Sequence, residues 1–426
     1  MATKTSTNLC VFEDEYYENF LPLTYTRPVF DLRCGMLTLF ERIKQFYPKK
    51  TKFTLLFREY LTAVEKQKYP DVELNTTLKG RYLFINARLL ANSSIPLEGP
   101  DEVGLVGKEV AYIRVNTDVL SDCLSYPLST EKIIESLKNK KIPFKDVKFD
   151  LIHYLWDLIY HNGSMIEKDF KSYKKESKTK LPQAVFVVGS KNDLYIGKDV
   201  KIMPTVVFDT TEGPIYISDN VKISAHVQIQ GPAYIGNKTQ LFPGQIWKNT
   251  SIGENCRIGG EVEGCIIHGY SNKRHTGFLG HAYLGEWINI GSGMSNSNLK
   301  NTYGEVKVKI KGEPVKTGKL HLGCFIGDHA KIGIVSSIYT GKNIGVAAHV
   351  LGSVFEDVPS FTFWAKSLGI PATELYLESV IEIQRRTFER RGHKQTQADI
   401  DLLKKVYELT AKEREQAKVK KGKIEH

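Results

Sequence analysis

The chain has 426 residues, enough for two or three domains, with 41% hydrophobic and 25% charged residues. This composition excludes wholesale disorder and a fibre, and no stretch approaches the ~20 apolar residues of a membrane span. Residues 1–17 contain no apolar segment of the secretory type, and the six cysteines form no CxxC pair. The sequence therefore predicts a cytoplasmic protein with reduced cysteines.

The net charge is +11, which favours nucleic acid, a membrane surface or small anionic ligands as partners. Part of the charge lies in a C-terminal run formed by Lys418, Lys420, Lys421 and Lys423. We interpret this run as a solvated tail and predict no nucleic-acid or membrane partner. The remaining charge suits phosphorylated ligands such as CoA and a nucleotide.

Residues 1–180 alternate short buried segments with helical patterns. Strands are expected at 9–12, 53–57 and 82–86, and helices at 36–47, 60–67 and within 130–160. This alternation predicts an α/β layer domain with a largely parallel sheet. The Lys- and Ser-rich segment 168–180 is expected to be a linker.

Between residues 196 and 350, apolar side chains recur every six positions. The series runs through Ile196, Ile202, Phe208, Ile217, Ile223, Ile229, Ile235, Leu241, Ile252, Ile258, Leu284, Ile290, Ile326, Ile332, Ile338, Ile344 and Val350. A period of six fits neither an α-helix nor a plain strand, but it fits a triangular coil of three hexapeptides. Residues 181–370 are therefore predicted to form a left-handed parallel β-helix of the hexapeptide-repeat type.

The repeat is broken at 262–283 and 294–324, and loops that leave a solenoid on one face usually build its binding site. After Pro371 the pattern predicts an amphipathic helix over 373–391, a turn at 392–396 and a second helix over 397–418. Residues 371–426 are thus expected to form a helical, basic tail.

One segment of the β-helix carries a specific motif. It reads His275-Thr276-Gly277-Phe278-Leu279-Gly280, then Asn289-Ile290-Gly291-Ser292-Gly293, then Asn298. This segment resembles the acetyltransferase core of the bifunctional GlmU enzymes, in which Tyr stands at the position of Phe278. The run from Leu21 to Pro28, with Asp31, Arg33 and Gly35, also resembles the GlmU-like sugar nucleotidyltransferases, which implies a Rossmann-like nucleotidyltransferase domain over residues 1–180.

The resemblance implies a role for several residues of the β-helix. His275 would be the general base, since an imidazole accepts the amine proton at neutral pH. Phe278, Asn289 and Lys273 would contact the acceptor, and Asn298 would lie near acetyl-CoA. Lys316, Lys319 and Lys366 are candidates for the CoA phosphates. Asn289 and Asn298 are alternatively corner residues, because Asn tolerates positive φ.

The N-terminal domain departs from the family pattern. The signature GxGTRMxSxLPK is absent, and Asn86 stands where an Asp normally binds Mg²⁺. Arg27 and Arg33 are candidates for binding phosphate oxygens, because Arg gives a bidentate grip. Asn86 is the third candidate for binding the nucleotide. Mg²⁺ is a candidate ion, but spacing does not choose between the available acids, which are Asp14, Asp31 and Asp101.

In the β-helix, the family's two sugar-phosphate cations fall on Phe242 and near Glu263. We therefore expect an acetyl-CoA-dependent N-acetyltransferase acting on an amino sugar phosphate, joined to a nucleotidyltransferase-like domain. Two alternatives remain open, an acyltransferase with an inert N-domain and a non-enzymatic scaffold that binds sugar nucleotides. A homotrimer is expected, because flat solenoid faces close naturally around a three-fold axis.

Overall fold

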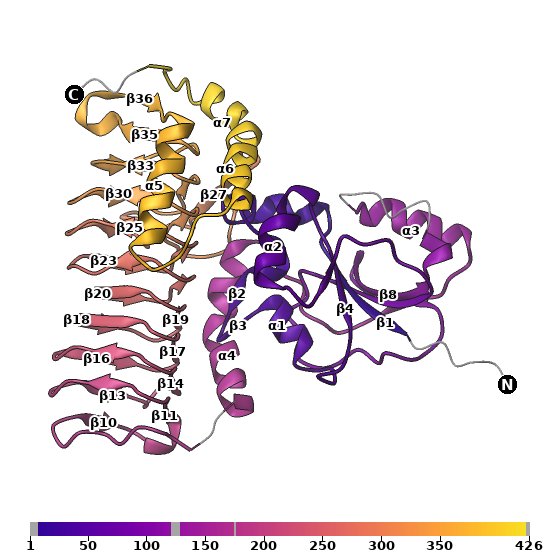
Figure 1. The fold of residues 1–426 in the computed structure, drawn as a ribbon, viewed down its shortest axis with the longest axis horizontal. Coiled ribbons are helices and arrows are strands. Elements are labelled where there is room, and N and C mark those ends of the chain that lie inside the picture. Colours follow the sequence, from indigo (N-terminus) through magenta and orange to yellow (C-terminus); the bar gives the residue numbers. More distant parts are fainter. Residues whose placement is uncertain (1–6, 121–127, 174–175, 423–426) are drawn as a thin grey trace. The chain divides into compact units, whose positions relative to one another are not determined.

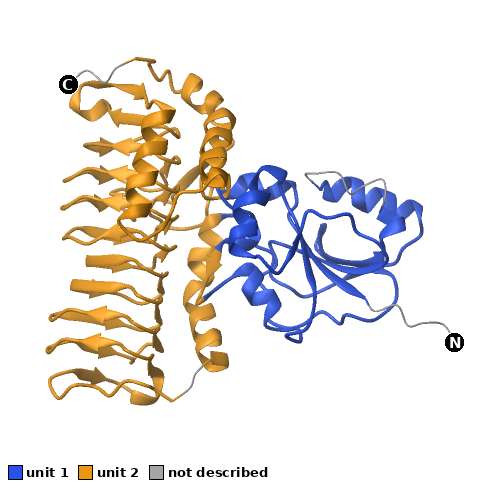
Figure 2. Cartoon of the chain, in the orientation of Figure 1, with its two compact units in different colours: residues 1–20, 26–32, 37–154 blue, residues 21–25, 33–36, 155–426 orange. Residues whose placement is uncertain are grey.

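The computed structural model describes residues 7–120, 128–173 and 176–422. Figure 2 shows its two compact units. Unit 1 comprises residues 1–20, 26–32 and 37–154, and unit 2 comprises residues 21–25, 33–36 and 155–426. Two short N-terminal segments, 21–25 and 33–36, therefore belong with the C-terminal part of the chain. The sequence predicted one boundary at residue 180 and no such exchange of segments.

Unit 1 is built on a seven-stranded sheet with the order β5-β4-β1-β6-β8-β7-β9. The strands are β1 (Asn8–Phe12), β4 (Phe53–Leu56), β5 (Glu73–Leu74), β6 (Arg81–Asn86), β7 (Glu102–Val106), β8 (Glu109–Asn116) and β9 (Phe144–Asp146). Strands β5, β4, β1 and β6 are parallel, whereas β8 runs antiparallel to β6 and β7. The three strands predicted from the sequence are confirmed as β1, β4 and β6.

The helices of unit 1 are α1 (Leu39–Lys44), α2 (Thr62–Lys68) and α3 (Thr130–Asn139). Helix α1 is shorter than the predicted 36–47, because Thr38 caps it. The Thr38 hydroxyl accepts the Glu41 N–H, and the Glu41 carboxylate accepts the Thr38 N–H. The expected helix within 130–160 is two helices, because β9 separates α3 from the next one.

That next helix is α4 (Leu155–Tyr173), which belongs to unit 2 and lies beside its strands in Figure 1. Leu155, Trp156, Leu158 and Ile159 are among its buried side chains. The linker expected at 168–180 therefore begins inside a helix, whose apolar face continues to Phe170.

Unit 2 is a stack of short parallel strands on three faces, as in a left-handed β-helix (Figure 1). One face holds β11 (Leu194–Ile196), β14 (Ile215–Ile217), β17 (Ala233–Ile235), β19 (Thr250–Ile252), β21 (Ile266–Ile267), β24 (Tyr283–Leu284), β29 (Phe325–Ile326) and β32 (Asn343–Ile344). A second path includes β10 (Phe186–Val188), β12 (Lys201–Ile202), β13 (Val207–Asp209), β15 (Lys222–Ile223), β16 (Val227–Gln230), β18 (Gln240–Ile246), β20 (Arg257–Glu263), β22 (Asn272–Lys273), β23 (Phe278–Gly280), β25 (Asn289–Ile290), β30 (Lys331–Ile332), β33 (His349–Val350), β35 (Thr362–Ala365) and β36 (Ile370–Glu374). A shorter face holds β26 (Ser295–Asn296), β31 (Ser337–Ile338) and β34 (Ser353–Val354).

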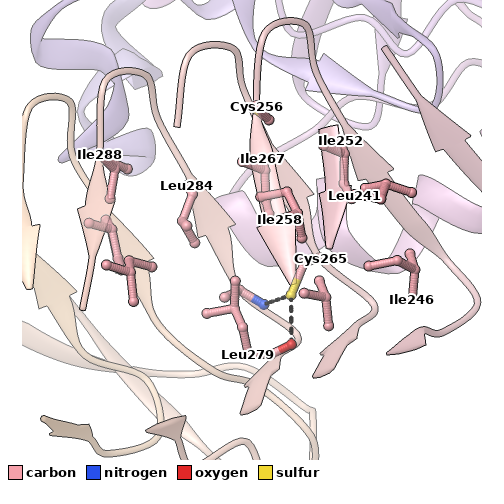
Figure 3. Packing of buried hydrophobic residues seen from close by; sticks show 14 of the residues in the cluster. Leu241, Ile246, Ile252, Cys256, Ile258, Cys265, Ile267, Leu279, Leu284 and Ile288 are labelled. Atoms are coloured by element: carbon pink, nitrogen blue, oxygen red, sulfur yellow. Dashed lines mark hydrogen bonds between the residues drawn. The ribbon is translucent and has the colours of Figure 1, made fainter. Parts of the chain in front are cut away.

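The six-residue periodicity is confirmed by the strand register. Ile217 pairs with Ile235 and Ile326 pairs with Ile344, so three hexapeptides complete one coil. The periodic side chains point inward and form one continuous apolar core. Figure 3 shows part of it, including Ile258 and Ile267 on neighbouring faces. Cys265 also lies in this core, where its Sγ donates to the Leu279 carbonyl.

The two predicted interruptions have different outcomes. Residues 262–283 do not leave the solenoid, because β21, β22 and β23 all pair with coil strands. The pattern was hidden there because polar Lys273 occupies an inward register position opposite Ile258. Residues 294–324 do contain an excursion, the antiparallel hairpin of β27 (Lys307–Ile310) and β28 (Glu313–Lys316).

The tail forms α5 (Leu377–Glu389), α6 (Gln397–Leu409) and α7 (Ala411–Gln416). The first predicted helix begins four residues late, because Thr373 lies in β36. Lys420 pairs with Thr373 by a β-bridge, while its side chain and those of Lys418 and Lys421 are exposed. Lys423 lies outside the described residues.

None of the described helices is long and apolar enough to cross a membrane. Cys10, Cys34, Cys256, Cys265 and Cys324 are free and buried, and Cys123 lies outside the described residues.

The stacked side chains of the β-helix core predict a large loss of stability when one of them is truncated. Ile235 is fully buried and pairs in register with Ile217 and Ile252. Ile235→Ala should lose about 2–5 kcal/mol of stability, because it leaves a cavity between stacked coils. Met203→Ala is the control, since Met203 is 55% exposed. Thermal melts should show a lower unit 2 transition for Ile235→Ala alone; equal melts would contradict this stacking.

Candidate active site

The motif residues of the β-helix begin at a corner loop that Lys273 stabilises. The Lys273 ammonium is buried and donates to the carbonyls of Gly259 at 2.8 Å, His275 at 3.2 Å and Gly277 at 2.7 Å. Burial lowers the pKa of Lys273 to about 8. Because these three bonds use all three ammonium donors, Lys273 positions the His275 loop instead of offering donors to an acceptor. The His275 side chain is exposed at the corner.

Phe278 and Asn298 come together on the following strand. A Cβ on Gly280 would lie 2.3 Å from the Phe278 ring and 2.8 Å from Asn298 Nδ2, so both side chains lie directly over this glycine. The Phe278 N–H donates to the Ser295 hydroxyl, which ties β23 to the following coil. Two of the predicted site residues are therefore neighbours.

His281 completes this group. Its Nδ1 lies 3.0 Å from Asn298 Nδ2, and its ring centroid lies 5.7 Å from that of His321 and 6.4 Å from that of Tyr160. The Tyr160 hydroxyl donates to the His321 carbonyl at 2.6 Å. Burial, and then the neighbouring His321, lower the pKa of His281 to about 4. The imidazole is therefore neutral at physiological pH and is held in one orientation.

Asn289 belongs to a separate polar column. Its Oδ1 accepts from Asn272 Nδ2 at 3.2 Å, and Arg391 Nη2 donates to Asn272 Oδ1. In the next coil, Lys331 pairs with Asn289, and its ammonium donates to the Trp287 carbonyl at 2.8 Å. Burial lowers the pKa of Lys331 to about 8. Asn289 therefore lies in a column that includes two cationic side chains, Arg391 and Lys331.

A guanidinium lies beside Phe242, where the family pattern has an Arg. The Arg274 Cζ is 4.3 Å from the centroid of the Phe242 ring. Arg274 is exposed and directly precedes His275. Arg274, from the following coil, therefore places a positive charge beside position 242.

The predicted CoA-binding lysines differ in their surroundings. Lys316 is exposed on the hairpin and lies opposite Lys307, with Lys309 on the same face. Opposed like charges repel, so an anion between them would stabilise the hairpin. Lys366 already contacts the Trp364 ring at 4.2 Å and Glu356 at 3.1 Å, and Lys319 lies 4.1 Å from the Tyr160 ring centroid.

The two arginines predicted to bind phosphate lie in different units of the chain. Arg33 and Gly35 belong to unit 2. The Arg33 N–H donates to the Tyr283 hydroxyl, while the Gly35 N–H donates to Asn162 and the Gly35 carbonyl accepts from Ser251. The backbone N–H groups of Arg33 and Gly35 are therefore used within unit 2, and phosphate binding by the Arg33 side chain stays a prediction. Arg27 is in unit 1, buried, with Nη1 3.9 Å from Asp31.

Asn86 lies at the end of β6 in unit 1, fully buried. Its Nδ2 donates to Asp14 at 2.8 Å and to the Val110 carbonyl at 2.9 Å, and its Oδ1 accepts the Arg88 N–H. Asp101 pairs with Arg81 away from this group.

Comparisons with known proteins address both parts of the chain. Residues 9–178 match a family model described as sugar nucleotidyl transferase. The bifunctional sugar-1-phosphate nucleotidylyltransferase/acetyltransferase of Sulfurisphaera tokodaii is 32% identical over 149 residues, which cover 32% of this chain and 37% of that protein. The bifunctional protein GlmU of Methanococcus maripaludis is 36% identical over 99 residues, covering 23% of this chain and 24% of that protein. These matches support a GlmU-like family.

In these two matches the chain spans 37% and 24% of the relatives' length. Among solved structures, UDP-N-acetylglucosamine acyltransferase from Campylobacter jejuni is 12% identical, with a TM-score of 0.30, over 52% of this chain and 86% of that chain. The predicted fold class is confirmed: a nucleotidyltransferase-like N-terminal domain precedes a long region of parallel strands that resembles a left-handed β-helix.

Sequence reasoning missed two features of these sites. It gave no weight to the pairing of His281 with Asn298, which lie 17 residues apart in the sequence. It also did not identify Arg88, whose contacts with Asp14 join residues 74 positions apart. The only sequence signal for Arg88 was its place two residues beyond Asn86.

His281 should make unit 2 sensitive to acid. Its pKa is lowered in the folded state, so between pH 6.5 and 4 the unfolded chain binds a proton that the folded chain refuses. Stability therefore falls as the pH drops through this window, by about 2 kcal/mol between pH 7 and pH 5. His281→Gln should reduce the difference in melting temperature between these two pH values, whereas His226→Gln, at an exposed position, should not. An unchanged difference in His281→Gln would contradict this assignment.

Proposed function

We propose that this GlmU-like chain is an acyltransferase whose β-helix moves an acetyl group from acetyl-CoA to the amine of an amino sugar phosphate. The observation that carries the proposal is the arrangement of the H-x-x-F-L-G segment. His275 stands on a corner loop tied down by Lys273, and Phe278 and Asn298 meet over Gly280 on the next strand. The names of the two curated relatives, both bifunctional, support the same activity.

The chemistry follows from these groups. The amine nitrogen attacks the thioester carbonyl carbon, the C–S bond breaks, and CoA leaves as the thiolate. The attacking nitrogen must lose a proton, which the His275 imidazole accepts. The neutral His281 ring and backbone N–H groups of the coils are available to stabilise the oxyanion.

Cations near this loop favour phosphorylated substrates. Arg274, held against Phe242 and adjacent to His275, suits the phosphate of an amino sugar. The opposed Lys307 and Lys316 suit the phosphates of CoA. Lys366 is a weaker candidate for that role, because Glu356 already neutralises it.

The general base can be tested directly. His275→Ala should lower kcat for acetyl-CoA-dependent thiol release by about 10²–10⁴, because no imidazole then accepts the amine proton. His226→Ala is the matched control, since His226 lies in an earlier coil. The assay follows free thiol with glucosamine 1-phosphate and related amino sugars. Activity of His275→Ala within a few-fold of the wild type would exclude this role.

Asn298→Ala should act differently from His275→Ala. Asn298 contacts His281, and its Nδ2 lies beside the Phe278 ring over Gly280. An amide does not serve as a base, so the loss of Asn298 should mainly raise KM for acetyl-CoA. A fall in kcat equal to that of His275→Ala, with KM unchanged, would contradict donor binding by Asn298.

The proposal includes a homotrimer, which the exposed apolar side chains of the last coils support. These are Ile334, Val335, Tyr339, Phe355 and Leu368, of which Val335 is 72% exposed. Isolated solenoids seldom expose so many apolar side chains in a short stretch, and a cyclic three-fold would cover them. Light scattering should give a mass near three times 48.3 kDa, and Val335→Glu should lower it. A wild-type monomer at working concentration would refute the trimer.

A cytoplasmic location is part of the proposal, because acyl-CoA and sugar phosphates are cytoplasmic metabolites and the described cysteines are unpaired. The rival proposal of a non-enzymatic scaffold predicts sugar-nucleotide binding without thiol release from acetyl-CoA on any amino sugar.

A second function concerns the N-terminal domain, for which the family match over residues 9–178 is the support. We expect it to bind a nucleoside triphosphate or nucleotide sugar with weak turnover. The assay mixes UTP or dTTP with sugar 1-phosphates and Mg²⁺ and follows pyrophosphate. Release at about 1–10³ s⁻¹ would show the weak-turnover part wrong. Absence of binding at millimolar nucleotide, unchanged in Arg27→Ala, would show the binding part wrong and favour an inert domain.

A further inference from the structure

The edge of unit 1 at which phosphates are expected is the carboxyl end of its parallel strands. In open α/β sheets, ligands bind at this end. β1 and β6 are adjacent and parallel, with Phe12 opposite Asn86. The residues that follow these strands, Asp14 and Arg88, therefore come to the same edge. A nucleotidyltransferase that uses Mg²⁺ would need carboxylate oxygens there.

Arg88 fills the space between the carboxylates of this edge. Its Nη2 lies 2.8 Å from Asp14 Oδ2 and 2.5 Å from Glu109 Oε2, so one nitrogen bridges two acidic side chains. Its Nε lies 3.1 Å and 2.9 Å from the two oxygens of Asp14. Both the Arg88 and Asp14 side chains are completely shielded from solvent.

An imidazole, a backbone carbonyl and an aromatic ring complete the enclosure of this guanidinium. His153 Nδ1 lies 3.4 Å from Arg88 Nη1. Arg88 Nη1 donates to the Ile152 carbonyl at 3.2 Å, and the Arg88 Cζ lies 4.6 Å from the Tyr16 ring centroid. The positive charge is thus balanced by two carboxylates and covered by an aromatic face. A buried pair of this kind is costly to break, because one charge would be left without compensation.

These residues do not fit a divalent ion. Both Asp14 oxygens already accept from Arg88, and Asn86 turns its Nδ2 toward Asp14 while its Oδ1 accepts the Arg88 N–H. Mg²⁺ needs oxygen ligands at about 2.0–2.1 Å in octahedral geometry. Among the described residues, no group of three or more His, Cys, Asp or Glu side chains is arranged to hold a metal ion.

We infer that Arg88 is the resident cation of this edge, standing in the place of a divalent metal, and that the Asp14–Glu109 site takes up no such metal in the native protein. A phosphate that reaches the edge then meets carboxylates already neutralised by a guanidinium. This inference concerns unit 1 alone and does not rest on acyl transfer in the β-helix.

The first test is Mn²⁺ binding to the full-length wild type, measured by electron paramagnetic resonance of free Mn²⁺. We expect no difference between the wild type and Asp14→Asn up to about 1 mM Mn²⁺. One Mn²⁺ per chain that is bound by the wild type and lost in Asp14→Asn would overturn the inference.

The second test removes the resident cation. Arg88→Ala leaves Asp14 and Glu109 facing each other, so its melting temperature should fall, and 5 mM Mn²⁺ should then raise it by about 4 °C or more. Neither the wild type nor Arg88→Ala/Asp14→Asn should respond. Arg81→Ala is the matched control, because it breaks the more exposed ion pair of the same sheet, with Asp101.

A folded Arg88→Ala protein that Mn²⁺ does not stabilise would overturn the idea that Arg88 stands in the place of a cation. Failure of Arg88→Ala to fold would leave the wild-type titration as the deciding measurement. Arg88→Lys, which keeps a cation at the position, should fold and show no Mn²⁺ response; a response equal to that of Arg88→Ala would contradict the inference.

Discussion

The stacking of apolar side chains inside the β-helix is the constraint on which the rest of unit 2 depends. Each coil is held by the register of its neighbours, as in the column formed by Ile217, Ile235 and Ile252. These side chains are buried only when the coils are stacked, so the stacking of the core fixes the position of each corner along the axis of the β-helix. The His275 loop and the Phe278 strand take their positions from this repeat rather than from contacts of their own.

One polar side chain, Lys273, interrupts the apolar repeat at the candidate active site. Lys273 takes an inward position that the pattern reserves for an apolar residue, opposite Ile258, and its ammonium collects three carbonyls of the adjoining loop. A buried charge is tolerated there because every donor is used. The break in the apolar repeat at Lys273 and the candidate active site therefore coincide for a physical reason. An apolar side chain at this position would leave the carbonyls of Gly259, His275 and Gly277 without the ammonium donor that they share.

The sequence predicted the β-helix well because its signal is local and repeated. Ile326, Ile332, Ile338 and Ile344 each carry the same information, so one irregular coil does not hide the period. A linear motif spans Phe278 and Asn298, so the sequence could group them in one candidate site, and the structure brings their side chains together over Gly280. The Asp14–Arg88 pair and the attachment of Gly35 to Asn162 were not predictable, because each depends on how distant segments fold together.

The chain alternates between the two units before it reaches α4, and this order affects synthesis. Residues 21–25 and 33–36 leave the ribosome long before their partners, since Tyr25 bonds to Glu413 and the Gly35 N–H to Asn162. Residues 26–32 of unit 1 lie between these two segments, which cannot make their contacts until the later part of unit 2 has been synthesised. A nascent chain stopped near residue 154 would therefore lack the partners of the Tyr25 hydroxyl and of the Gly35 N–H. Domains usually fold as they emerge. Here the final assembly of the N-terminal region is postponed until α7, which carries Glu413, has been made.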